Sequence, residues 1–132
     1  MSAPHGMAIV PSTHDVATTM DKLEAIVNSK GMKVMARVNH AANAESVGME
    51  LRPTELLIFG NPEAGTKLML ASQSMGIDLP QKLLVWESED GNVLIGFNDP
   101  TYLKGRHATE GCDNVFEAVS GALNTIAKTA AE

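Results

Sequence analysis

The sequence predicts a single α+β domain, a two-layer sandwich in which two long helices cover one face of a mostly antiparallel sheet of four or five strands. Length and composition are the first reason, because 132 residues, 44% hydrophobic and 20% charged, suffice for one core of ordinary size. The second reason is the order of the periodic segments: a strand, a long helix, two strands, a shorter helix, a hairpin and a long helix. This order favours helices on one side of the sheet.

The N-terminal part predicts a tail, a strand and a helix. Residues 1–6 are expected to form a flexible tail and residues 7–132 the folded domain. The short apolar run Met7–Val10 ends at a proline and predicts a strand. Ser12 offers a hydroxyl N-cap with Asp15 three residues later, which predicts the start of a helix. The following apolar residues recur at helical spacing up to a glycine stop: Val16, Met20, Leu23 and Val27.

The middle of the chain predicts two more strands, each followed by a helix. Residues 32–40 alternate between apolar and polar, as in a half-buried strand, and the alanine-rich segment 41–46 favours one or two helical turns. Residues 55–59 are apolar on both faces, which predicts a buried strand. Asn61 can cap the next helix, and Pro62 fits its first position. Its inward side is predicted to carry Leu68, Met69, Ser72 and Met75 before Gly76 ends it.

The C-terminal part predicts a hairpin, a loop and a helix. Asp90-Gly91 lies between two β-rich runs, residues 83–87 and 93–97, and favours a tight turn. A polar loop is expected over residues 101–111. Asp113 can then cap the last helix, whose apolar stripe contains Phe116, Val119, Leu123, Ile126 and Ala127.

The strand at 55–59 and the hairpin lack the alternation expected of a sheet that is covered on one face only. A helix or another protein chain is therefore expected to cover the second face of the sheet. The helix at 61–75 is one candidate, and a second copy of the chain is the other, because small domains can bury an open sheet face symmetrically. We expect a homodimer.

Composition also limits the partners. A net charge of −6 and 4% aromatic residues argue against nucleic acid. No segment approaches the roughly 18 apolar residues of a spanning helix, and the N-terminus lacks the pattern of a secretory signal. A cytoplasmic protein with no membrane partner is expected, unless a leader has been removed. The single Cys112 excludes an internal disulfide.

Three groups of polar residues are candidates for a ligand site. His40 has the strand parity of the apolar residues before it, so its ring is expected to point toward the apolar side, as a packed residue or as a ligand or acid–base group. Glu45 and Arg52 could meet His40 if the connection folds back, or they could form an ion pair that only fixes this connection. The helix start after Asn61 matches no phosphate-binding motif, and Glu63 would repel an anion there.

The third group lies in the loop predicted at 101–111. Arg106 and His107, with Tyr102 and Lys104 nearby, form a cationic spot in an acidic chain. Such a loop could close over an anion or a carboxylate, although loops are often simply polar.

The sequence shows no hydrolase or metalloprotease motif and no paired His and Asp with a nucleophile. An enzyme with His40 or His107 as general base and an arginine as substrate clamp is an alternative function. Another is a haem or metal protein with His40 or His107 as ligand, although the eight methionines fit core packing better. The sequence requires no cofactor.

Five short segments within residues 7–130 form a recognisable combination: Asn39-His40-Ala41-Ala42, residues 47–62 with Phe59-Gly60-Asn61-Pro62, Gly65-Thr66-Lys67-Leu68-Met69, Asp78-Leu79-Pro80 and Arg106-His107. This combination resembles the bacterial "domain of unknown function 302" family. The resemblance implies a fold like that of the TATA-box-binding protein, in the order strand, helix, four strands, helix. It also implies dimers, and it implies no settled activity.

Six residues fall on the motif positions of that family and form the predicted ligand site: His40, Arg52, Asn61, Thr66, Arg106 and His107. The leading hypothesis is a small dimeric protein that binds a polar or anionic small molecule.

Overall fold

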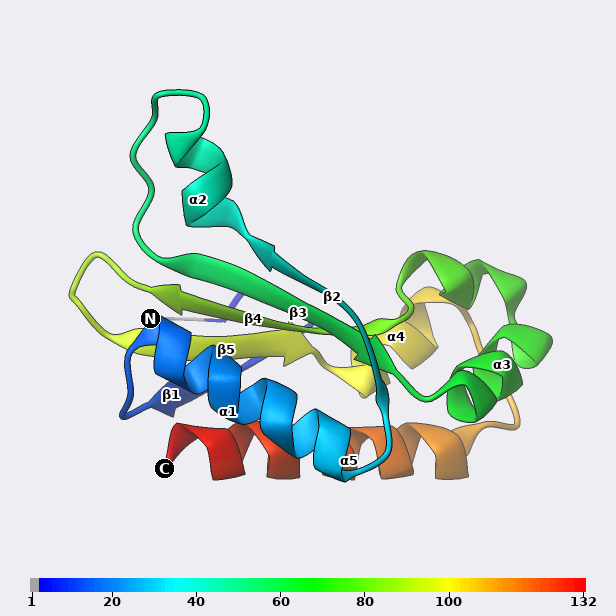
Figure 1. The fold of residues 1–132 in the computed structure, drawn as a ribbon. Coiled ribbons are helices and arrows are strands. Elements are labelled where there is room, and N and C mark those ends of the chain that lie inside the picture. Colours follow the sequence, from blue (N-terminus) through cyan, green and yellow to red (C-terminus); the bar gives the residue numbers. More distant parts are fainter. Residues whose placement is uncertain (1–2) are drawn as a thin grey trace.

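One five-stranded antiparallel sheet forms the centre of the protein, and the two long helices lie along one of its faces (Figure 1). The structure is a computed structural model that describes residues 3–132. The strands lie in the order β1-β5-β4-β3-β2. Their bounds are β1 Met7–Ser12, β2 Lys33–Asn39, β3 Thr54–Gly60, β4 Gln81–Glu87 and β5 Val93–Asn98. The predicted fold class and the order strand, helix, four strands, helix are confirmed.

In residues 3–132, two long helices, three shorter ones and one 3₁₀ helix lie on one face of the sheet or at its ends. Their bounds are α1 Val16–Ser29, α2 His40–Glu45, α3 Pro62–Ala71, the 3₁₀ helix η1 Gln73–Ile77, α4 Pro100–Arg106 and α5 Asp113–Ala131. In Figure 1, α3 and α4 gather at one end of the sheet, whereas α2 projects away from the other end. No helix in residues 3–132 is long and apolar enough to cross a membrane.

The main core lies between the sheet and the pair α1 and α5. It contains Met20, Leu23 and Val27 from α1, Leu57 and Phe59 from β3, Leu83 and Val85 from β4, and Leu123, Ile126 and Ala127 from α5. A second cluster joins α3, η1 and α4 to the start of α5 through Leu68, Met75, Leu103, Cys112 and Phe116. The helical stripes predicted from the sequence therefore face the core.

Helix caps explain two of the boundaries. Asp15, and not Ser12, is the N-cap of α1, because its carboxylate accepts a hydrogen bond from the Thr18 N–H at 2.7 Å. That bond stabilises the charged carboxylate and lowers the pKa of Asp15. Asn61 caps α3 as predicted by accepting from the N–H groups of Glu63 and Ala64, and Pro62 occupies the first turn.

Two expected segments differ in the structure. Residues 100–106 form the helix α4 and not part of a loop, because Asp99 accepts from the Thr101 N–H at 2.9 Å and Pro100 fits the first turn. These cap signals were visible in the sequence, but the polar and glycine-containing stretch after them favoured a loop. The helix after β3 ends at Ala71 and not at Gly76, and residues 73–77 continue as η1.

A β-bulge changes the faces of β2. The pairing with β3 shifts between Val34 and Ala36, so one extra residue enters β2 there. Ala36 and Val38 consequently lie on the face of the sheet away from the long helices, whereas Arg37 lies on the helix side and bonds to α1. The expectation that His40 points toward the apolar side is wrong, because His40 begins α2 and is exposed.

The expected hairpin joins β4 and β5 through residues 88–92, which is a longer connection than the tight turn predicted.

Of the expected N-terminal tail, residues 1–2 lie outside the described residues. Gly6 accepts a hydrogen bond from the Asp99 N–H at 2.8 Å, and the His5 ring lies edge-on to Tyr102. These contacts attach residues 5–6 to the start of α4.

No described helix covers the second face of the sheet, which we call the open face. α3, the helix suggested for this role, packs instead against η1 and α5. On this face the indole of Trp86 packs directly over Gly96. A Cβ on Gly96 would lie 2.8 Å from the indole, so this close contact requires a glycine. By strand register, the open face carries Ile9, Leu56, Ile58, Leu84, Trp86 and Leu94.

Arg37 ties α1, β2 and β3 together on the helix side. Its guanidinium donates to Asp21 at 2.7 Å and to Glu55 at 3.0 Å, and Glu24 lies 3.6 Å away. Burial by itself lowers the pKa of Arg37, but the hydrogen bonds to Asp21 and Glu55 outweigh it and raise that pKa. Glu55 is only 8% exposed, and Arg37 compensates its buried charge.

Replacing Arg37 is expected to destabilise the protein through Glu55. The Arg37→Met variant should lower the free energy of unfolding by about 2–3 kcal/mol, because it leaves a buried carboxylate unpaired. Urea denaturation followed by circular dichroism measures this change. The matched control Lys30→Met, at an exposed position after α1, should stay within about 0.5 kcal/mol. Equal stabilities for the two variants would contradict this account of Arg37.

Candidate functional site

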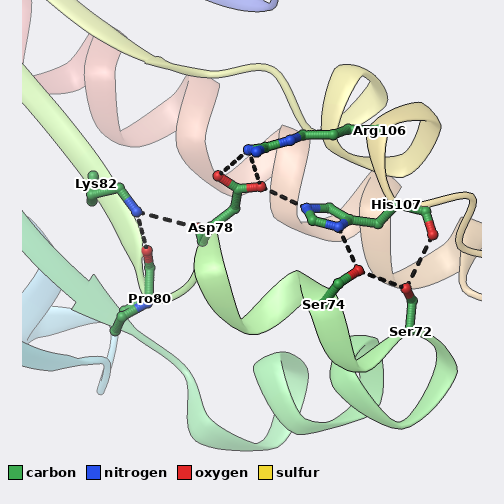
Figure 2. Close-up of polar contacts among 7 residues, drawn as sticks. All are labelled: Ser72, Ser74, Asp78, Pro80, Lys82, Arg106 and His107. Carbon is green, nitrogen blue, oxygen red and sulfur yellow. Dashed lines mark hydrogen bonds and ion pairs between the residues drawn. The ribbon is translucent and has the colours of Figure 1, made fainter.

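A hydrogen-bonded group of five residues joins α4 to η1, and we call it the Asp78 cluster (Figure 2). The Arg106 guanidinium donates to both carboxylate oxygens of Asp78, at 2.9 and 2.8 Å. The Nε2 atom of His107 lies 2.6 Å from Oδ2 of Asp78. On the other side of the ring, Nδ1 lies 2.7 Å from the Ser74 hydroxyl. The Ser72 hydroxyl completes the cluster by donating to the His107 carbonyl at 3.0 Å.

The partners of His107 determine how its ring is protonated when it is neutral. Asp78 accepts two hydrogen bonds from Arg106, so it is an ionised carboxylate that can only accept. The Nε2 atom of His107 must therefore carry the proton shared with Asp78. Nδ1 then has a free lone pair, and the Ser74 O–H donates to it. The cluster forms a series of hydroxyl, imidazole and carboxylate.

Local structure places these groups. His107 follows the last turn of α4, and its side chain is only 5% exposed, whereas Ser74 lies on the exposed side of η1. Asp78 comes directly after η1, and Lys82 donates to the carbonyls of Asp78 and Pro80 and so fixes the connection to β4. The short elements on both sides therefore hold the ring and the carboxylate in position.

This arrangement corrects two interpretations of the sequence. Arg106 and His107 were expected in a loop free to close over a ligand, but both are bonded to Asp78. The sequence showed no paired His and Asp with a nucleophile, yet Ser74, His107 and Asp78 form such a set in space. No local pattern reveals it, because 29 residues separate Asp78 from His107.

A separate apolar cleft of about 670 Å³ lies between α3, α5 and the adjacent end of the sheet, and we call it the α3–α5 cleft. Asn61 and Thr66, two of the six predicted site residues, contribute to its lining. Lys67 also lines it and forms an ion pair with Glu63 at 3.4 Å. The apolar part of the wall includes Met32, Phe59, Met69, Leu79, Ala118 and Val119.

A second hollow, of about 740 Å³, lies between α2 and the start of β3 and has a mixed polar and apolar lining. Glu45 and Arg52 both line it, but the ion pair between them that the sequence suggested is absent from residues 3–132. Arg52 instead donates to the Glu87 carbonyl at 3.1 Å. His40 lies next to this hollow in the chain and is not part of its lining.

Five of the six predicted site residues lie in three places, and His40, exposed at the start of α2, belongs to none of them. Arg106 and His107 meet in the Asp78 cluster, Asn61 and Thr66 line the α3–α5 cleft, and Arg52 lines the hollow beside α2. α2, which begins at His40, and α4, which ends next to His107, lie at opposite ends of the sheet in Figure 1. Within residues 3–132, no three His, Cys, Asp or Glu side chains are placed to hold a metal ion.

The fold is similar to that of a solved protein. The crystal structure of an uncharacterized conserved protein DUF302 from Bacillus stearothermophilus superposes with a TM-score of 0.84 over 98% of this chain and 100% of that chain. The two sequences are 19% identical, so this likeness concerns the fold.

Three curated relatives come from Brucella and are named as fluoride-specific ion channels. FluC 1 of Brucella suis, FluC 1 of Brucella abortus and FluC 2 of Brucella melitensis are each 42% identical to this chain over 127 residues. The match covers 96% of this chain but only 47–50% of each relative, so the chain spans about half of their length.

The sequence also matches a family profile over most of its length. Residues 8–126 match the family described as "Domain of unknown function DUF302". The matched region extends from β1 into α5 and contains the Asp78 cluster and most of the cleft lining. The chain therefore belongs to the DUF302 family.

Proposed function

We propose that this protein is a homodimer that binds a small amphiphilic molecule in the α3–α5 cleft. The observation that carries this proposal is the cleft itself, about 670 Å³ in volume and lined mostly by apolar side chains. Ligand pockets usually measure about 300–1,000 Å³ and combine apolar walls with a few polar groups. Asn61 and Thr66 supply polar groups of this kind.

The lining favours a ligand with an aliphatic body and an uncharged polar end. Methionine side chains adapt to flexible chains, and the lining includes Met32, directly before β2, and Met69 of α3. The one cation in the lining, Lys67, already pairs with Glu63, so the site offers little net charge to an anion. The ligand proposed from the structure is thus less polar than the one expected from the sequence.

Filling the cleft should weaken binding. Ala118→Phe places a ring where α5 lines the cleft, and the Kd for the neutral fluorescent probe Nile red should rise at least tenfold, measured by fluorescence titration with 1-decanol as competitor. Ala25→Phe, on the exposed side of α1, is the matched control and should bind as the wild type does. Equal affinities for the two variants, or no displacement by decanol, would refute the proposed site.

The open face supports the dimer. Five strands spaced about 4.8 Å apart give a flat area of roughly 500 Å² per copy, below the 800 Å² or so that each partner buries in a typical stable interface. The segment after α2 can supply the difference, because Val47, Met49 and Leu51 are large, apolar and exposed. α2 projects beyond the sheet, away from α1 and α5 (Figure 1). We infer that two copies pack through their open faces and that these segments extend the contact.

A charge in the open face should separate the copies. Leu84→Glu places a carboxylate beside Leu56 of β3, and sedimentation equilibrium should report the monomer mass for this variant and the dimer mass for the wild type. Emission from Trp86, the one tryptophan, should shift to longer wavelength as the indole becomes exposed to water. Thr125→Glu on the exposed side of α5 should remain dimeric. A monomeric wild type would refute the dimer.

A second candidate function is to assist or regulate a fluoride channel. It rests on one observation, that half of each Brucella relative matches this chain and that these relatives are named as fluoride-specific ion channels. We infer that a domain with the sequence and fold of this chain assists or regulates such a channel.

Fluoride efflux from liposomes tests this role. The full-length Brucella suis relative is compared with a version that lacks the matching half, alone and with this chain added. We expect the truncated form to differ from the full-length form at least twofold in efflux rate, and the added chain to restore the original rate. Identical rates in all three samples would refute this candidate, and serum albumin controls for nonspecific effects of added protein.

A further inference from the structure

The Asp78 cluster contains a set of groups that ligand binding in the α3–α5 cleft does not use. Ser74, His107 and Asp78 are connected in series, with 2.7 Å between the hydroxyl and the ring and 2.6 Å between the ring and the carboxylate. A nucleophile bonded to a base, which is in turn oriented by a third group, is the arrangement that activates a serine. The tautomer set by Asp78 leaves Nδ1 free to accept the serine proton.

The exposures of the Ser74, His107 and Asp78 side chains fit the roles of nucleophile, base and orienting group. The His107 side chain is 5% exposed and the Asp78 side chain 13%, so the base and its orienting group are shielded from water. Ser74 is exposed, so a reagent can reach its hydroxyl. The ring of His107 is held by its own hydrogen bonds to Ser74 and Asp78, while Arg106 fixes the Asp78 carboxylate and Ser72 fixes the backbone carbonyl of His107.

The surroundings of Ser74 indicate which reagent it would accept. Side chains three residues apart lie above one another in a 3₁₀ helix, so Ile77 stands beside Ser74 on η1. Ile77 is 71% exposed and can contact a short apolar acyl group. Gly76, on another side of the same helix, lines the α3–α5 cleft, so the two sites are distinct.

We propose that Ser74 is an activated nucleophile that takes an acyl group from small apolar esters. Its Oγ attacks the ester carbonyl carbon while its proton passes to Nδ1 of His107. The bond from the carbonyl carbon to the leaving oxygen then breaks, and that oxygen takes the proton from His107. Water repeats the two steps on the acylated serine, which releases the carboxylic acid and restores the hydroxyl.

Acylation by p-nitrophenyl butyrate tests this proposal. The wild type should release nitrophenolate at least 100-fold faster than Ser74→Ala, a factor typical of general-base assistance. Mass spectrometry of the quenched protein should find the butyryl group on the peptide that contains Ser74. Ser29→Ala, at an exposed serine of α1, should react as the wild type does.

Two further variants separate this activity from structural effects and from the proposed ligand site. His107→Gly should lose the fast reaction and regain at least part of it when imidazole is added, which a purely structural role of His107 would not produce. Ala118→Phe should be acylated normally even if it no longer binds Nile red. Equal rates for the wild type and Ser74→Ala, or a butyryl group found only at other residues, would overturn the proposal whatever the outcome for the cleft.

Discussion

The packing of α1 and α5 on one face of the sheet is the interaction on which the rest of the molecule depends. α1 packs against β2, β3 and β4, and α5 packs against β1 and β5. Met20 and Leu23 of α1 and Ile126 of α5 are fully buried in this core. Because both long helices lie on the same side, no described helix remains for the other face. The shorter helices α3 and α4 gather at one end of the sheet, where α3 lines the cleft and the C-terminal end of α4 contributes Arg106 and His107 to the Asp78 cluster.

Local patterns were sufficient to predict the fold and insufficient to predict the sites. The apolar stripes of α1 and α5 and the cap at Asn61 are properties of neighbouring residues, so the sequence reveals them. The bulge in β2 adds one residue and reverses the parity on which the orientation of His40 was based. The contact between Asp78 and His107 depends on how the hairpin and α4 bring distant segments together, and no periodic pattern records this.

The cleft and the Asp78 cluster share a wall. Gly76 and Leu79 line the cleft, and Asp78 between them bonds to α4 on the other side of that segment. Lys82 holds the same segment through the carbonyls of Asp78 and Pro80. The shape of the cleft therefore depends on polar bonds that do not face it. An occupant that moved this wall would also move the carboxylate that orients His107.

The place of β1 in the sheet has a consequence for how the chain folds. Among the described strands β1 pairs only with β5, and residues 13–92, more than half of the chain, separate the two strands. Pairings between residues so distant in sequence form slowly, because a large loop must close before they contribute any stability. During synthesis, β1 leaves the ribosome first but has no partner until β5 follows. β1 is thus the strand that remains unpaired for longest during synthesis, when chaperones and other chains can contact it.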